Sequence, residues 1–270
     1  MTQPTAILFG ATGGIGQAIA NILCKNQINV VLVGRNENTL KSLHQQLAQD
    51  YQNVHLEFIS CDVSIAESRQ NLVKNLTTLN TPIQYFIYNA GINYFSLFTD
   101  QSRELIEKMM QVNVIQPLQL IQDIIPLMLK SGPAQIINVG STFGSIGYPG
   151  YVSYCASKFA LKGATEALAR EYSDTSLKFR YFSPRATDTP MNNSCVVEMN
   201  QKLGVKMDSP EVVAEELYQF LKSDKAYYQV GYPEKIFVKV NQVLPDVVSK
   251  SIHKDIGEIK SFAKRSGQLG

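Results

Sequence analysis

The sequence predicts an α/β fold, a doubly wound parallel sheet of about seven strands with helices on both faces. Short, nearly continuous apolar runs alternate with helical patterns, as expected for strands that are buried on both sides. A glycine-rich segment separates the first apolar run from the first helical pattern. The 270 residues, 44% of them hydrophobic, can bury the core of one such domain.

The expected elements follow one another in regular order. Apolar runs rich in Val, Ile, Leu and Phe predict strands at 5–9, 29–33, 54–59, 83–88, 134–140 and 177–183, with a weaker seventh near 227–230. Helical spacing of apolar residues predicts helices at 15–26, 37–49, 65–79, 102–130, 152–173 and 210–222. No linker rich in Pro, Gly or Ser interrupts this series. We therefore expect a single domain over 1–232 and a helical extension of the same domain over 233–270. Within the first range we expect a loop at 187–209 that closes over a bound small molecule, with an apolar lining suggested by Met191, Cys195, Val196, Val197, Met199 and Leu203.

The glycine-rich segment predicts a nucleotide-binding turn of Rossmann type. Gly10, Gly14 and Gly16 follow the first strand directly and lead into the first helix, together with Thr12 and Ile15. Glycine allows the backbone to turn sharply and to approach a pyrophosphate, which the N-terminus of the helix then faces. Glycines alone could be a flexible turn, but the strand before, the helix after and the second strand favour a dinucleotide site.

A tyrosine and a lysine form the second motif. Tyr154 and Lys158 are four residues apart in a helical pattern, so they share one face, and Ser141 lies thirteen positions before the tyrosine. An ammonium group close to a phenol favours the phenolate and lowers the phenol pKa from its usual value of about 10. Such a tyrosine can exchange a proton near neutral pH, with Ser141 holding the same substrate oxygen. Chance pairs of this kind are common on helices, so the glycine turn is needed to support the assignment.

Together these residues resemble the short-chain dehydrogenase/reductase family over about residues 5–230. The resemblance implies an oxidoreductase that transfers a hydride between a nicotinamide and a small-molecule carbonyl or alcohol substrate. Its catalytic residues would be Asn113, Ser141, Tyr154 and Lys158. Besides the glycine turn, the cofactor would contact Asp62, Val63, Asn89, Ala90, Gly91, Tyr154, Lys158, Pro184, Thr187 and Thr189.

The resemblance also implies how the catalytic residues act. Tyr154 would exchange the proton, Ser141 would orient the oxygen, and Lys158 would hold the nicotinamide ribose. Asn113 precedes Pro117 by four residues, and proline cannot donate the helical hydrogen bond to the Asn113 carbonyl. That carbonyl would hold a water in a proton relay, although an ordinary proline kink is the alternative.

The end of the second strand indicates the cofactor. NAD enzymes usually have Asp or Glu at this position, but here Gly34 is followed by Arg35 and Asn36. No carboxylate repels a 2′-phosphate, and the planar guanidinium of Arg35 suits one, so we expect NADP(H) to be preferred over NAD(H). Alternatively, Arg35 is a solvated turn residue or stacks on the adenine without selecting a cofactor.

Two positions depart from the family pattern. Phe9 replaces the usual threonine before the first glycine, which removes a hydroxyl that braces the turn. Arg185 follows Pro184, where most relatives have glycine. Its guanidinium could contact an anionic substrate group or the cofactor phosphates, or it could fold away and pair with Asp188.

The residues after 233 form a basic amphipathic pattern. Apolar residues recur at helical spacing at Ile236, Phe237, Val240, Val243, Leu244, Val247, Val248, Ile252, Ile256, Ile259 and Phe262, and basic residues outnumber acidic ones. The pattern fits helices packed over the substrate cleft or against a second subunit, with solvated lysines. It also fits helices at 234–265 that lie on an anionic membrane surface, which would suit an apolar, acyl or lipid-like substrate.

Composition limits the partners and the location. A net charge of +2 gives no reason to expect nucleic acid, and the four cysteines and three histidines show no metal-site spacing. We find neither a signal peptide nor a run of about 18 apolar residues, so we expect no transmembrane segment. The prediction is a cytoplasmic homo-oligomer, dimer or tetramer, with reduced cysteines, which lies at the inner face of a membrane if 234–265 binds one.

A non-catalytic alternative keeps the same fold. The chain could be a nucleotide-sensing or scaffold protein that binds the cofactor without turnover. The presence of all four residues, Asn113, Ser141, Tyr154 and Lys158, disfavours this alternative, because a protein that only binds the cofactor does not need all four side chains.

Overall fold

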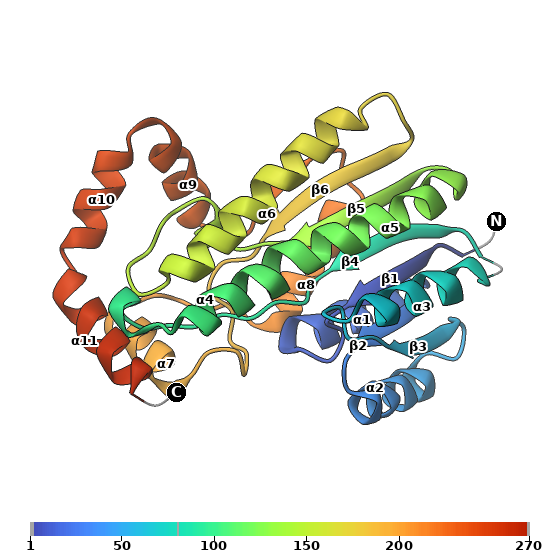
Figure 1. Cartoon of the computed structure of the whole chain (residues 1–270), viewed down its shortest axis with the longest axis horizontal. Coiled ribbons are helices and arrows are strands. Elements are labelled where there is room, and N and C mark those ends of the chain that lie inside the picture. The colour runs from blue at the N-terminus through green and yellow to red at the C-terminus, as the bar shows by residue number, and fades with distance from the viewer. Residues whose placement is uncertain (1–2, 80, 269–270) are drawn as a thin grey trace.

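The computed structural model describes residues 3–79 and 81–268 and confirms the α/β prediction (Figure 1). Seven strands form one sheet in the order β3-β2-β1-β4-β5-β6-β7, and all neighbours are parallel. The strands are β1 (Thr5–Phe9), β2 (Asn29–Gly34), β3 (Leu56–Ser60), β4 (Ile83–Tyr88), β5 (Ala134–Val139), β6 (Leu177–Ser183) and β7 (Tyr227–Gln229). The strand order reverses between β1 and β4, which is where doubly wound sheets bind their ligands.

Helices cover both faces of the sheet. Alternate residues of β1 point to opposite sides, as in any strand. On one side Ala6 and Leu8 join a core with α1 (Gly14–Lys25), α2 (Glu37–Asp50) and α8 (Pro210–Leu221). On the other side Ile7 and Phe9 join a core with α3 (Ala66–Thr77), α5 (Gln116–Lys130) and the C-terminal part of α6 (Val152–Glu171).

The helix predicted at 102–130 is divided by a wider turn. It consists of α4 (Arg103–Met110), a π-helical turn (Gln111–Ile115) and α5. Pro117 has no N–H for the Asn113 carbonyl, and a wider turn accommodates this loss. By length and composition the stretch Arg103–Lys130 could cross a membrane, but half of its most apolar window is buried inside the fold, as in a core helix of a soluble protein.

Two expectations about elements were inaccurate. β3 begins at Leu56 rather than at residue 54, and the predicted loop 187–209 contains a helix, α7 (Ser194–Lys202). The side chain of Asn193 caps α7 by accepting a hydrogen bond from the Val196 N–H at 3.0 Å. Cys195, Val196 and Met199 are buried against the C-terminal helices, so tertiary packing stabilises a segment whose β-branched residues have little helix propensity.

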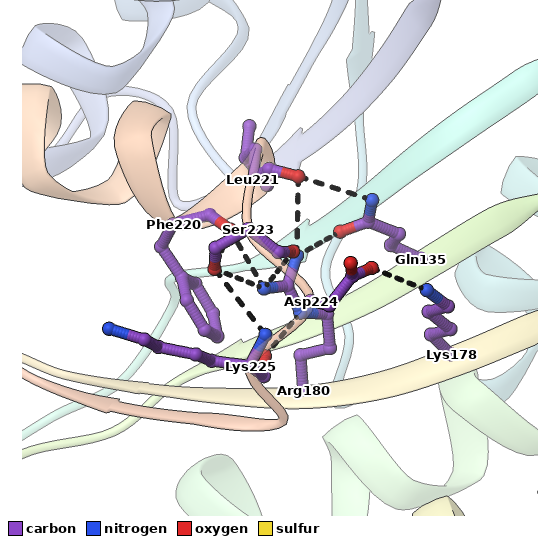
Figure 2. Close-up of polar contacts among 8 residues, drawn as sticks. All are labelled: Gln135, Lys178, Arg180, Phe220, Leu221, Ser223, Asp224 and Lys225. Carbon is purple, nitrogen blue, oxygen red and sulfur yellow. Dashed lines mark hydrogen bonds and ion pairs between the residues drawn. The ribbon is translucent and has the colours of Figure 1, made fainter.

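A buried arginine in the middle of β6 joins the last strands to α8 (Figure 2). The Arg180 side chain is almost fully buried and lies 3.9 Å from the ring centroid of Phe220. Burial lowers its pKa to about 10. Its guanidinium donates to the carbonyls of Phe220 (2.7 Å), Leu221 (3.3 Å), Ser223 (2.8 Å) and Lys225 (2.8 Å), and to the side chain of Gln135. A cation thus satisfies the free carbonyls at the C-terminus of α8, where the helix dipole favours positive charge.

The C-terminal extension forms three helices at one end of the molecule (Figure 1). These are α9 (Glu234–Val243), α10 (Pro245–His253) and α11 (Ile256–Gly267). Val238 and Val248 pack on Ile146. Farther along, Ile259 and Phe262 of α11 join the cluster that contains α7. The predicted domain range 1–232 begins with residues 1–2, and the predicted extension 233–270 ends with residues 269–270; these four residues lie outside the described residues. Two 3₁₀ turns, Phe98–Asp100 and Thr142–Gly144, complete the assignment.

All four cysteines are free and buried. They lie in separate places: Cys24 in α1, Cys61 after β3, Cys155 in α6 and Cys195 in α7. Burial raises the pKa of the Cys24 thiol to about 12 and that of the Cys155 thiol to about 11.

Candidate active site

A cavity of about 370 Å³ opens at the carboxyl ends of the central strands. Its walls come from the segments after β4, β5 and β6, from α6 and α7, and from the C-terminal helices. The predicted site residues that line it are Ile15, Asn89, Gly91, Ser141, Tyr154, Lys158, Pro184, Thr187 and Thr189. Segments distant in the sequence therefore meet where the sheet topology expects a ligand.

Tyr154 and Lys158 share one face of α6, as their spacing predicts. The Lys158 Nζ atom lies 5.7 Å from the centroid of the Tyr154 ring and donates a hydrogen bond to the Val139 carbonyl at 3.2 Å. Val139 ends β5, and Ser141 follows two residues later. The Ser141 hydroxyl accepts from the Phe143 N–H at 3.1 Å, and it lies close enough to the Tyr154 phenol to lower the pKa of that group. A serine and a tyrosine hydroxyl therefore lie side by side, with an ammonium close behind them.

The pKa values in this cleft differ from the expectation. Burial raises the pKa of Tyr154 to about 12, and the nearby Ser141 hydroxyl opposes this only in part. Burial also lowers the pKa of Lys158 to about 8. Although Tyr154 lines the cavity and keeps some accessible surface, protein surrounds it closely, so a phenolate would lose most of its hydration. The net pKa of Tyr154 is therefore raised and not lowered as predicted, because desolvation has the largest effect in this cleft.

Asn113 lies just outside the cavity, in the π-helical turn. Its side-chain oxygen accepts from the Ile92 N–H at 2.9 Å, and its amide donates to the Ile92 carbonyl at 2.8 Å and to the Ser157 hydroxyl at 3.0 Å. A Cβ atom placed on Gly91 would lie 3.2 Å from the Asn113 Oδ1 atom and 3.5 Å from the Lys158 Nζ atom. The four residues predicted as catalytic are thus brought together, and the Asn113 side chain fixes the segment after β4.

The glycine turn is too tightly packed for larger residues. Gly10 has φ +70°, and a Cβ atom there would lie 2.8 Å from the Ala90 N atom. A Cβ atom on Gly16 would lie 2.0 Å from the Gly10 carbonyl oxygen, and Thr189 lies directly beside Gly14. Only glycine therefore fits at Gly10 and Gly16. The turn leaves backbone without side chains at the N-terminus of α1, as phosphate binding requires.

Backbone groups and Asn89 brace this turn in place of the missing hydroxyl at Phe9. The Gly10 N–H donates to the Val33 carbonyl at 3.0 Å, and the Asn89 amide donates to the Gly10 carbonyl at 3.3 Å. Within the turn, the Thr12 carbonyl accepts from the Gln17 side chain at 2.8 Å. Phe9 itself is buried in the core, 5.6 Å from the Tyr88 ring.

The residues assigned to the adenosine half lie at the ends of β2 and β3, beyond the cavity. Arg35 is exposed, whereas Val63 is buried. The Asn36 side chain caps α2 by accepting from the Thr39 N–H at 3.1 Å. The Asp62 carboxylate accepts from the Ser64 hydroxyl (2.6 Å) and N–H (2.9 Å), and these bonds, helped by Arg35, lower its pKa. Arg35 is therefore an exposed cation at this edge, and the Asn36 Oδ1 and Asp62 Oδ1 atoms have local partners.

Arg185 lies in the wall of the cavity, and its partners are Asp208 and Glu234 rather than Asp188. Its guanidinium pairs with both oxygens of Asp208 at 2.6 and 2.7 Å and with Glu234 at 3.2 Å. It also donates to the Tyr232 carbonyl at 2.9 Å. Its side chain is only 12% exposed, and the Asp208 side chain 9%. Arg185 thus joins the segment before α8 to the first turn of α9, and the alternative in which it pairs with Asp188 is not found.

The sequence analysis did not identify the aromatic part of the apolar wall. Phe143, Tyr148 and Tyr151 line the cavity together with Tyr154, and the rings of Phe143 and Tyr148 stack at 5.0 Å. The four aromatic residues within 143–154 were a signal for this wall. From α7 and the C-terminal helices the cavity is closed by Met191, Val196, Met199, Phe237, Val248 and Ile252.

Comparison with known proteins identifies the family. The family model for short chain dehydrogenases matches residues 4–200. The chain belongs to the short-chain dehydrogenase/reductase family. This short-chain dehydrogenase/reductase is 30% identical over 236 residues to the 3-oxoacyl-[acyl-carrier-protein] reductase of Rickettsia felis, across 86% of this chain and 94% of that protein.

Solved structures share the fold. A short-chain dehydrogenase from Sphingobium yanoikuyae in complex with NADPH has a TM-score of 0.75 at 21% identity, covering 93% of this chain and 96% of that one. One from Burkholderia phymatum in complex with NAD has a TM-score of 0.78 at 19% identity, covering 94% of each chain. As a member of this family, the chain is an NAD(P)-dependent oxidoreductase that acts on CH–OH or C=O groups.

Proposed function

We propose that this short-chain dehydrogenase/reductase reduces apolar ketones, of the acyl type, with NADPH. The observation that carries the proposal is the position of Ser141, Tyr154 and Lys158 in a cavity whose other walls are mostly aromatic and aliphatic. Its volume of about 370 Å³ lies within the range of small-molecule pockets. The Rickettsia relative, by its name, reduces a 3-oxoacyl group.

The residues present fit the dinucleotide. The backbone cradle at Gly10 and Gly16 would hold the pyrophosphate, and the exposed Arg35 would pair with a 2′-phosphate. Lys158 would bind the nicotinamide ribose. When bound, the nicotinamide supplies a hydride to the carbonyl carbon of the substrate.

Tyr154 supplies the proton. With a pKa of about 12 the phenol is protonated at neutral pH, so its hydroxyl can donate to the carbonyl oxygen as that oxygen gains negative charge. Ser141 orients the same oxygen with a second hydrogen bond. The phenolate that remains is stabilised by the Lys158 ammonium, which is still mostly charged at pH 7 because its pKa is about 8.

A panel of ketones tests this function. We expect NADPH oxidation with 3-oxoacyl thioesters, with kcat/KM rising as the acyl chain lengthens, because each buried methylene contributes about 0.8 kcal/mol. Tyr154→Phe should abolish turnover, whereas the matched variant Tyr172→Phe, at the end of α6 away from the cavity, should retain it. Turnover only with short polar ketones would refute the substrate class. Equal turnover in wild type and Tyr154→Phe would refute the role of the tyrosine.

A further inference from the structure

We infer that the corner between α9 and α10 is a docking surface for an anionic lipid bilayer. Three large apolar side chains are exposed at this corner, Val243 (76%), Leu244 (57%) and Val247 (54%), and Ile236 (55%) is exposed about two turns earlier on α9. We call this set the α9–α10 ridge. It lies in the helical end of the molecule, away from the sheet (Figure 1).

The ridge is an ordered part of the fold. The Leu244 N–H donates to the Val240 carbonyl at 2.7 Å, and the Val247 N–H donates to the Leu244 carbonyl at 3.1 Å. The opposite faces of the same helices are covered, since Val238 and Val248 pack on Ile146. Single exposed apolar residues such as Ile65, Phe98 and Val212 are ordinary and lie on separate elements, but a contiguous apolar set at one corner marks an interaction surface.

Exposed lysines accompany the ridge. Lys239 on α9, Lys250 on α10 and Lys254 just after it are exposed, and within the described residues no ion pair joins them to a carboxylate. Of the four acidic residues of the same region, Glu234 pairs with Arg185 and Glu258 pairs with Lys202. Asp246 and Asp255 are exposed and have no ion pair among the described residues, so three unpaired lysines stand beside two unpaired carboxylates. Apolar side chains among unpaired lysines are the chemistry of a protein surface that enters the headgroup region of an anionic bilayer.

The charges favour a bilayer over a second copy of the chain. A two-fold symmetric contact through the ridge brings the same patch of both copies together. Such a contact would gather six lysines (Lys239, Lys250 and Lys254 of each copy) but only four carboxylates (Asp246 and Asp255 of each copy), so an excess of positive charge would remain in the interface. An anionic bilayer provides a counter-charge for each lysine and an apolar phase for the ridge.

The ridge also adjoins the substrate cavity. Phe237, Val248 and Ile252, on the same two helices, line that cavity. Docking therefore places the bilayer about one helix diameter, roughly 10 Å, from the cavity wall. Membrane docking itself depends only on the surface and stands independently of the proposed reaction.

Vesicle flotation with the full-length protein tests the docking surface. We expect flotation with vesicles of phosphatidylcholine and phosphatidylglycerol at low salt, less flotation at high salt because screening weakens the attraction, and little with phosphatidylcholine alone. The combined variant Val243→Ser/Leu244→Ser/Val247→Ser should lower the partition coefficient at least tenfold. Its control is Ile65→Ser/Phe98→Ser/Val212→Ser, which removes three exposed apolar side chains from separate elements and should float like wild type.

The lysines are tested in the same assay. Lys239→Gln/Lys250→Gln/Lys254→Gln should weaken binding to anionic vesicles about a hundredfold, since each lysine near the surface contributes about fivefold. Lys25→Gln/Lys41→Gln/Lys130→Gln changes the net charge equally at sites remote from the ridge and should have a smaller effect. Circular dichroism and the thermal midpoint show whether each variant is folded, and the lysine set gives the answer if the serine set is not. Absence of flotation in wild type, equal loss in the control sets, or a dimer that dissociates in the ridge variant without any flotation would each overturn the proposal.

Discussion

Replacing Arg185 by Met tests how strongly the buried ion pair holds the substrate segment to the C-terminal helices. Methionine keeps most of the side-chain length but removes the charge that faces Asp208 and Glu234, whose side chains are 9% and 20% exposed. Removing one partner of a buried pair costs about 3–5 kcal/mol, because the other charge stays desolvated. Since the Glu234 carboxylate keeps some contact with water, we expect the lower end, about 3 kcal/mol.

Thermal and urea unfolding measure this loss. For a chain of this size 1 kcal/mol corresponds to about 2 °C, so the thermal midpoint should fall by about 6 °C. The matched control is Arg170→Met, whose pair with Glu166 at 3.9 Å is exposed and should contribute less than about 1 kcal/mol. The double variant Arg185→Met/Asp208→Leu should recover part of the stability, because only the more exposed Glu234 carboxylate is then left without its partner. If Arg185→Met costs no more than Arg170→Met, the ion pair has no structural importance and the reasoning fails.

The remaining predictions concern the reaction and the cofactor. Lys158→Ala should lose both turnover and NADPH affinity, measured by fluorescence titration, whereas Tyr154→Phe should leave the affinity nearly intact; unchanged affinity in Lys158→Ala would remove the lysine from the cofactor site. Because burial lowers the pKa of Lys158 to about 8, its ammonium is present below that pH and lost above it, so kcat/KM for ketone reduction should fall as pH rises through about 8. A flat profile from pH 7 to 10 would contradict this. Arg35→Ala should weaken NADPH binding about tenfold to a hundredfold by removing a charge-assisted contact, and should leave NADH binding unchanged; equal NADPH affinity in wild type and variant would exclude Arg35 as the selector.

The sheet and the catalytic cluster were predictable because both are encoded locally. Strands buried on both faces appear as apolar runs, and the glycine turn places α1 after β1. Helical spacing puts Tyr154 and Lys158 on one face, and the parallel sheet brings Ser141 to the same edge. Each of these relations involves residues close in sequence or fixed by strand order.

The rest depends on contacts between distant segments. Arg185 pairs with a residue 23 positions away and another 49 positions away, and nothing in the local sequence distinguishes them from Asp188. The pKa of Tyr154 is raised by the protein packed around it, because desolvation has the largest effect there. Periodicity likewise predicted the C-terminal helices, but only the structure separates their covered face from the exposed ridge at Val243 and Leu244.

The four buried thiols give this chain internal reporters of its own opening. The thiolate is the form of cysteine that reacts with alkylating agents. It is scarce at pH 7, because burial raises the thiol pKa to about 12 for Cys24 and to about 11 for Cys155. Cys195 lies in α7 over the cavity, whereas Cys24 lies in α1 against the sheet. Alkylation of Cys195 therefore records the movement of α7, and alkylation of Cys24 records the separation of a core helix. Mass spectrometry of the two sites over time would distinguish access to the cavity from loss of the fold, with no label engineered into the protein.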